Sequence, residues 1–167
     1  MKLFILRHGI AVVRDDANAE NDSRRQLTPK GKRQLRRTAA AMKQMGLRFD
    51  LILSSPYLRA KQTAEIVAES LKLQKRLEYS DALAPDGSPK NLTRELNELE
   101  PAPENVLLVG HEPYLSRLIS LLTTGSLDLM MEFKKGGLCK LEVEKLSHER
   151  CAMLVWLLTP KQMKRLA

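Results

Sequence analysis

The first nine residues constrain the fold of this chain more than any other stretch. Residues 2–6, Lys-Leu-Phe-Ile-Leu, are a short apolar run that predicts a buried strand, and Arg7, His8 and Gly9 follow it at once. In an open α/β sheet, ligands bind beyond the carboxyl ends of the strands. A strand that delivers a cation, an imidazole and a glycine to that edge predicts a histidine that acts on a phosphate.

Apolar runs alternate with helical patterns along the rest of the chain. The expected strands are 2–6, 49–53, 105–109, 137–143 and 151–158, and the expected helices run from 29 to 45, from 56 onwards, over 91–99, after 113 and over 160–167. Residues 10–27 and 74–90 show no periodicity and are expected to be loops. Strands that alternate with helices predict a three-layer α/β/α fold around a mainly parallel sheet.

Length and composition indicate an ordinary globular protein. The 167 residues, of which 43% are hydrophobic and 29% charged, are expected to form one domain over 1–167. No apolar run approaches the roughly 20 residues that cross a membrane, and the N-terminus lacks the pattern of a signal peptide. We therefore expect a cytoplasmic protein without a membrane partner. Cys139 and Cys151 lack metal-ligand spacing, and we interpret them as reduced thiols.

The net charge of +8 favours anionic partners without naming one. Many of the cations lie in the expected first helix and in the C-terminal tail: Lys30, Lys32, Arg33, Arg36, Arg37, Lys161, Lys164 and Arg165. We interpret them as a solvated helix face and a solvated tail rather than as a nucleic-acid surface.

Three of the predicted strands end on residues that can bind phosphate. Arg7 and His8 follow the first strand, Arg59 lies just beyond the second, and His111 follows the third. The carboxyl ends of parallel strands share one edge, so two arginines and two histidines are expected to converge on one crevice. Helices that begin there add free backbone N–H groups and positive dipole ends. Together these features predict an oxyanion or phosphate pocket.

These residues fall in motifs that resemble a known family. The motifs are Leu-Arg-His-Gly at 6–9, Ser-Pro-Tyr-Leu-Arg-Ala-Lys-Gln-Thr-Ala at 55–64 and Val-Gly-His-Glu-Pro at 109–113. Their order and context resemble the histidine phosphatase superfamily, which has the phosphoglycerate-mutase-like fold, over essentially the whole chain. The small size and the Arg-Gln-Leu-Thr-Pro-Lys-Gly stretch at 25–31 are most similar to the SixA-type phosphohistidine phosphatases.

The resemblance implies that His8 is a nucleophile that becomes phosphohistidine. It also implies that Arg7, Arg59 and His111 bind the phosphoryl oxygens. Phosphoryl transfer asks a protein mainly for positioning and cationic stabilisation, so these roles agree with the chemistry. An imidazole attacks only through an unprotonated nitrogen, so His8 must be neutral.

Two further contacts are expected around this nucleophile. The backbone beside Gly9 is placed to accept a hydrogen bond from the other ring nitrogen of His8 and to set its tautomer. Arg25 is a candidate phosphate ligand from the loop, with Arg24 as the competing choice. The resemblance implies neither a metal nor a cofactor.

The chain departs from larger members of the superfamily in two ways. Residues 78–87 lack the family's usual pattern around an acidic residue that protonates an alkoxide leaving group, although Asp81 or Asp86 remains a candidate for that acid. There is also no room for a large cap insertion. A missing acid fits phosphohistidine, because its leaving group is an imidazole. An open site fits a protein substrate, with a histidine phosphotransfer domain as one candidate.

Two other functions stay open on the sequence alone. The first is a phosphatase or mutase for small phosphate esters that uses Asp81 or Asp86 as the acid. The second is a non-catalytic domain that binds phosphoprotein or nucleic acid through the same basic crevice, and of these a nucleic-acid partner is the less favoured. The sequence gives no indication of the oligomeric state.

Overall fold

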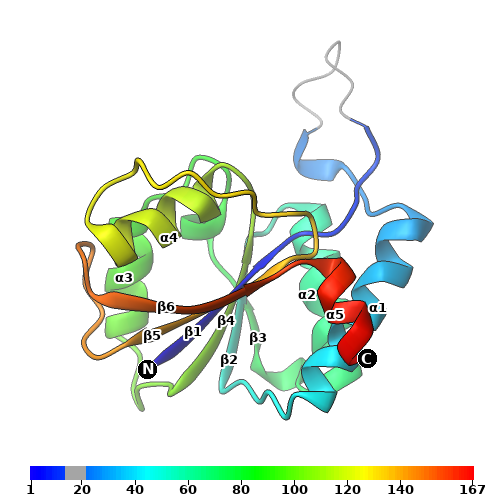
Figure 1. Cartoon of the computed structure of the whole chain (residues 1–167), viewed down its shortest axis with the longest axis horizontal. Helices are drawn as coiled ribbons and strands as arrows, with labels where there is room; N and C mark the ends of the chain where they lie inside the picture. The colour runs from blue at the N-terminus through cyan, green and yellow to red at the C-terminus, as the bar shows by residue number, and fades with distance from the viewer. Residues whose placement is uncertain (14–21) are drawn as a thin grey trace.

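The computed structural model describes residues 1–13 and 22–167, and their centre is a mixed sheet (Figure 1). Among these residues the sheet has six strands in the order β3-β2-β4-β1-β5-β6. The strands are β1 Lys2–Arg7, β2 Leu51–Ser54, β3 Leu77–Tyr79, β4 Asn105–Gly110, β5 Leu138–Val143 and β6 Ala152–Leu158. β3, β2, β4 and β1 are parallel to one another, whereas β5 is antiparallel to β1 and β6 is antiparallel to β5. The predicted mainly parallel sheet is confirmed.

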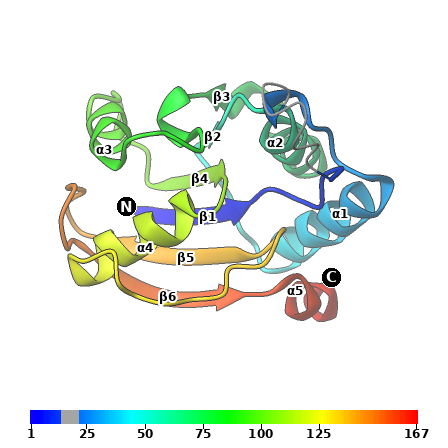
Figure 2. The same cartoon turned by 90° about the horizontal axis from the view of Figure 1, so that it is seen from above.

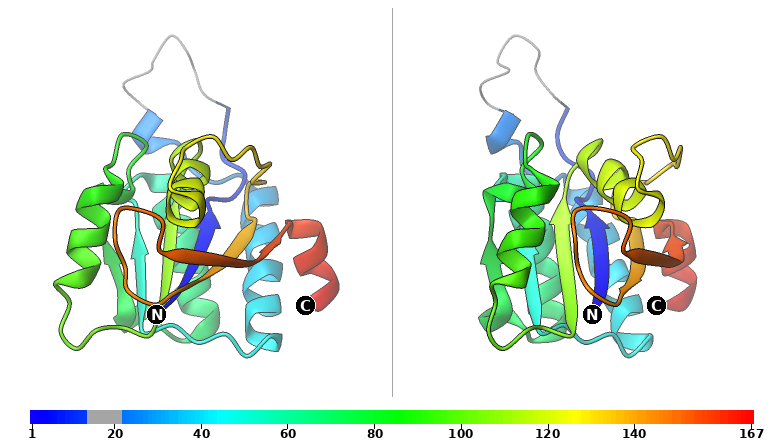
Figure 3. Two further views of the ribbon diagram at one scale, coloured as in Figure 1. Left: turned by 60° about the vertical axis from the view of Figure 1, so that its left-hand side comes forward. Right: turned by 90° about the vertical axis from the view of Figure 1, so that its left-hand side faces the viewer.

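Helices cover both faces of this sheet, as Figure 2 and Figure 3 show. The helices are α1 Pro29–Gln44, α2 Leu58–Leu71, α3 Pro89–Asn97, α4 Tyr114–Thr124 and α5 Pro160–Leu166. Successive side chains of a strand point to opposite faces. Leu3 and Ile5 therefore pack with α3 and α4, while Phe4 and Leu6 pack with α1, α2 and α5. Two apolar cores separated by the sheet give the three layers that the sequence predicts. Among the described residues, no helix is both long and apolar enough for a membrane crossing.

The stretch 74–90 is more ordered than its lack of periodicity predicts. It contains the edge strand β3, which pairs with β2 but leaves Glu78 and Tyr79 exposed. An exposed edge strand does not need alternating apolar residues, so periodicity cannot detect it. The turn pattern Ser88-Pro89 also begins α3, two residues earlier than predicted, because the Ser88 side chain accepts a hydrogen bond from the Asn91 amide.

The start of α2 also differs from the sequence prediction. The pair Ser55-Pro56 predicts a cap followed by the first helical residue, but the helix begins at Leu58 and Tyr57 is its N-cap. The Ser55 hydroxyl accepts from the Tyr57 amide at 3.3 Å and also contacts His111 at 2.8 Å. The side chain that would cap the helix is therefore engaged with a histidine from another strand end.

The ends of the expected loop 10–27 are tied to each other and to α1. Val12 N donates to Gln26 O at 3.0 Å, and Thr28 N donates to Ile10 O at 2.9 Å. Residues 14–21 of that loop lie outside the described residues. Gly31, in the first turn of α1, lies directly against the Ile10 carbonyl. This contact anchors the chain that leaves β1 and His8 to the beginning of α1.

The close approach at Gly31 predicts that Gly31→Ala destabilises the protein. Helix propensity alone would make alanine more favourable by about 1 kcal/mol. An added Cβ, however, would overlap the backbone oxygen of Ile10, and such overpacking costs about 1–3 kcal/mol. Urea denaturation followed by circular dichroism measures the difference. Arg36→Ala, at an exposed site on the same helix, is the control, and a Gly31→Ala protein as stable as the parent would contradict the prediction.

Candidate active site

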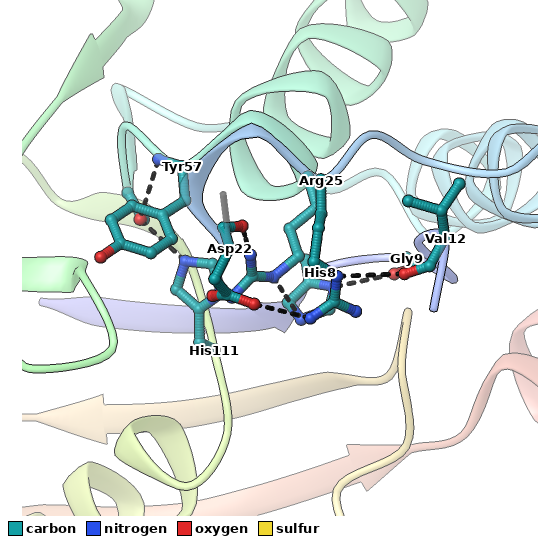
Figure 4. Close-up of polar contacts among 9 residues, drawn as sticks. His8, Gly9, Val12, Asp22, Arg25, Tyr57 and His111 are labelled. Carbon is teal, nitrogen blue, oxygen red and sulfur yellow. Dashed lines mark hydrogen bonds and ion pairs between the residues drawn. The ribbon is translucent and has the colours of Figure 1, made fainter. Parts of the chain in front are cut away.

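Three neighbouring parallel strands bring the predicted residues to one edge of the sheet. His8 follows β1, Ser55 follows β2 and His111 follows β4, and β4 lies between the other two strands. The rings of His8 and His111 are 5.1 Å apart, centroid to centroid (Figure 4). The strand order thus converts three distant sequence motifs into one polar cluster.

The His8 ring is held by one contact at each nitrogen. Its Nδ1 lies 2.7 Å from the Gly9 carbonyl oxygen, and its Nε2 lies 3.3 Å from Arg59 Nε. A carbonyl oxygen only accepts and a guanidinium only donates, so Nδ1 carries the hydrogen and Nε2 keeps its lone pair. The expected backbone contact beside Gly9 is present in this geometry.

Burial and neighbouring cations keep the His8 imidazole neutral. Only 5% of the residue is exposed, and loss of hydration is the main cause that lowers its pKa from 6.5 to about 3. The charges of Arg59, Arg7 and Lys135 lower the pKa further, while the hydrogen bond to Gly9 opposes them. Near neutral pH Nε2 is therefore unprotonated, and its lone pair accepts from Arg59 Nε.

His111 is fully buried and has a similar electrostatic environment. Its Nε2 lies 2.8 Å from the Ser55 hydroxyl, whereas its buried Nδ1 has no hydrogen-bond partner among the residues that the structure describes. Burial first, and then the charge of Arg59, lower its pKa to about 2. A neutral ring has one N–H group. If the Ser55 hydroxyl donates to Nε2, that N–H is on Nδ1, the nitrogen that lacks a partner among the described residues.

Arg59 is the most constrained cation of the cluster. It lies in the first turn of α2 and is 5% exposed. Its Nη1 donates to the Asp22 backbone oxygen at 2.7 Å, and its Nη2 contacts the Asp22 carboxylate at 2.9 Å. The guanidinium also lies 5.4 Å from the centre of the Tyr57 ring. These contacts, together with the one to His8, fix the direction of the side chain.

Arg7 contributes charge to the cluster from the end of β1. Its Nη1 donates to the Phe133 carbonyl at 2.6 Å, and its buried Nε has no partner among the described residues. Burial lowers the pKa of the Arg7 guanidinium, but arginine stays charged at neutral pH. Its positive charge reaches both His8 and His111, because it lowers the pKa of each ring.

Arg25 joins the cluster through Asp22, and Arg24 is exposed. Arg25 Nη1 contacts the Asp22 carboxylate at 2.7 Å, and Arg25 Nε donates to the Val12 carbonyl at 3.0 Å. Of the two loop arginines weighed from the sequence, Arg25 is the one linked to Arg59, through their shared carboxylate (Figure 4).

Sequence reasoning missed the carboxylate that joins these arginines. Burial alone would raise the pKa of Asp22, but the hydrogen bonds and charges of Arg25 and Arg59 outweigh it and lower the pKa. Asp22 is therefore ionised and unsuited to donate a proton. Its place three residues before Arg25 is visible in the sequence, but the surrounding segment has no periodicity that would show where either side chain points.

Thr63 is a second residue that the sequence did not reveal. Its hydroxyl accepts from the Gly9 amide at 3.1 Å and donates to the Arg59 carbonyl at 2.6 Å. It thereby links the turn that carries His8 to the helix that carries Arg59. Thr63 is part of the 55–64 motif, but only the packing of α2 against this turn shows which atoms it contacts.

The two candidate acids lie in a separate hollow beside the cluster. Asp81 and Asp86 are exposed and line a space of about 730 Å³ that also touches Tyr57. Within the described ranges neither carboxylate bonds to the histidines or arginines above. Glu112, in the third motif, accepts from the Ser116 amide at 3.0 Å in the first turn of α4. No three His, Cys, Asp or Glu side chains of the described chain are grouped as a metal site.

The sequence and the fold match a known family of proteins. Residues 3–84 match the family model of the histidine phosphatase superfamily, branch 1. The chain belongs to this superfamily, and its relatives place it with the SixA-type proteins.

Three relatives show how far this similarity extends. The chain is 33% identical to the phosphohistidine phosphatase SixA of Escherichia coli over 75% of its own length and 76% of the relative. It is 38% identical to an uncharacterised protein of Picosynechococcus over 83% of its length and 82% of that protein. A solved structure of the protein histidine phosphatase SixA complexed with tungstate superposes with a TM-score of 0.81 at 28% identity, covering 98% of this chain and all (100%) of the other.

The buried, cation-flanked position of His8 predicts an unusual titration. Protonation would place an extra positive charge beside Arg59 and Arg7, so the ring should stay neutral from pH 8 to pH 5 and protonate only towards a pKa of about 3. Ring ¹⁵N and ¹³C shifts, assigned by their loss in His8→Ala, should be constant over that range. A midpoint near the ordinary value of 6.5 would contradict the prediction.

Proposed function

We propose that this protein is a phosphohistidine phosphatase that works through a covalent phospho-His8 intermediate. The single observation that carries the proposal is the His8 ring, which is neutral, oriented by Gly9 and directed with its Nε2 lone pair at Arg59. Similarity to SixA of Escherichia coli, a phosphohistidine phosphatase, supports the choice of substrate.

In the first step the Nε–H of Arg59 turns from Nε2 of His8 to a phosphoryl oxygen, and the freed lone pair of Nε2 attacks the phosphorus atom in line with the bond that breaks. A new N–P bond forms, and the electron pair of the old P–N bond stays on the substrate imidazole, which takes a proton from water. In the second step water attacks the phosphorus and gives a proton to the hydroxide left by the first step. The His8–phosphorus bond breaks, its electron pair returns to Nε2, and inorganic phosphate leaves. The sum is hydrolysis with His8 restored.

The surrounding residues stabilise the charge on the transferred group. Arg59 and Arg7 supply permanent positive charge, and Arg25 adds to it from the loop. In this proposal the Ser55 hydroxyl donates to Nε2 of His111, so that His111 acts as a neutral donor through Nδ1–H. Preorganised donors of this kind contribute most of the rate in phosphoryl transfer, and we propose that they act without a metal ion.

The acidic residues of the site fit a leaving group that needs no strong acid. Asp22 is held ionised between Arg25 and Arg59, and it positions their guanidinium groups. Asp81 and Asp86 line the hollow next to Tyr57. If an alkoxide were the leaving group, one of these two carboxyl groups would have to protonate it. An imidazole leaves more readily than an alkoxide, so phosphohistidine fits the described residues better than a sugar or glycerate phosphate.

Transfer of label from a phosphohistidine substrate tests the proposal. A ³²P-phosphohistidine peptide should label the protein transiently with an acid-labile phosphate, in the presence of EDTA as well as in its absence. His8→Ala should take up no label, whereas His148→Ala, which removes an exposed histidine, should behave like the parent. Binding without any transfer would favour the non-catalytic alternative. Faster turnover of glycerate or sugar phosphates than of phosphohistidine would favour the ester phosphatase.

Arg59→Ala should lower kcat about 10²–10³-fold, because it removes a fixed positive donor to the transition state. Asp22 holds the guanidinium in place before substrate arrives, so most of the loss should be in kcat rather than in KM. Steady-state kinetics with the same peptide measure it. Arg117→Ala, at an exposed site on α4, is the control, and a near-parental rate for Arg59→Ala would refute the assigned role.

A further inference from the structure

The fold places the basic residues of α1 and α5 on one surface. Lys30, Arg33 and Arg37 follow the i, i+3, i+7 spacing of one helical face, and Lys161 and Lys164 lie on the short helix α5. The two helices pack side by side, as Figure 2 shows. These five side chains line one hollow of about 430 Å³.

This hollow continues to the candidate active site. A neighbouring hollow of about 590 Å³ is lined by Arg7, Lys134 and Lys135. The two hollows share four lining residues, Ile10, Gln34, Pro160 and Lys161. We call the two together the basic groove. It runs from Arg7, next to His8, along the seam between α1 and α5.

The groove has a strong excess of positive charge. All five cations of the α1–α5 part are exposed, and none is paired with a carboxylate within the described part of the chain. Among the described residues that line the two hollows, Glu132 is the one with an acidic side chain. It lines the hollow beside Arg7 and forms an ion pair with Lys134. Clustered charges of one sign along a concave surface attract an oppositely charged partner more strongly than scattered ones.

We propose that the basic groove docks an acidic face of the phosphoprotein substrate while its phosphohistidine occupies the site at His8. This step rests on the proposed function. The groove opens onto Arg7, so a partner lying in it places a protruding phosphoryl group at the catalytic cluster. Ile10 and Pro160 give it an apolar floor suited to protein side chains. Among the described lining residues no aromatic ring is present on which a nucleic-acid base could stack.

The helices themselves provide a matched pair of variants. Arg33→Glu/Lys164→Glu changes the groove, whereas Arg36→Glu/Arg165→Glu changes exposed cations of the same two helices that do not line it. Each pair lowers the net charge by four. A long-range effect of total charge would therefore affect both variants equally, and docking in the groove would affect only the first.

The substrates are two peptides with one phosphohistidine each, one flanked by a run of glutamates and the other by glutamines, together with free phosphohistidine. The parent protein should turn over the acidic peptide with a kcat/KM about tenfold higher than the neutral one at low salt. The groove variant should lose this preference and the control variant should keep it, while all three proteins hydrolyse free phosphohistidine equally.

Three results would overturn the docking proposal. The first is a parent protein that does not prefer the acidic peptide, and the second is an equal loss of that preference in both variants. The third is a groove variant that still prefers the acidic peptide but no longer binds a single-stranded oligonucleotide that the parent binds. The last would assign the groove to nucleic acid. Failure of the parent protein to hydrolyse any of the three substrates would instead refute the proposed function.

Discussion

The polar edge of this protein depends on how the His8 ring is held. One nitrogen donates to the Gly9 carbonyl and the other accepts from Arg59, so orientation and tautomer are determined together. Each partner is itself fixed: Thr63 bonds to both the Gly9 amide and the Arg59 carbonyl, and Asp22 contacts the Arg59 guanidinium. The geometry of the His8 ring thus rests on the hydrogen bond between α2 and the turn that follows β1.

The same arrangement combines permanent positive charge with neutral imidazole rings. Cations beside a histidine disfavour its protonated form, as does burial. Here both effects act in one direction, and they leave His8 and His111 neutral among arginines that stay charged. The carboxylate of Asp22 lies between two of those arginines without protonating either ring, because its own pKa is lowered.

Much of the architecture was predictable because it follows from local patterns. Apolar runs of strand length, capped helix starts such as Thr28-Pro29 and the alternation of strands with helices predict the three layers. The errors have local causes as well. Strand β3 is an exposed edge that lacks a hydrophobic pattern, and the Ser55 hydroxyl accepts from the Tyr57 amide before α2 begins and also contacts His111.

The sequence by itself determined which residues reach the edge of the sheet, since motifs at the ends of parallel strands must converge there. Only the tertiary structure decided what they touch. Asp22, Thr63 and Ser55 join the cluster through contacts with residues 37 to 56 positions away, which no periodicity records. Likewise, basic residues of α1 and α5 that read as separate solvated segments form one groove, because the sheet brings the C-terminal helix back against the first.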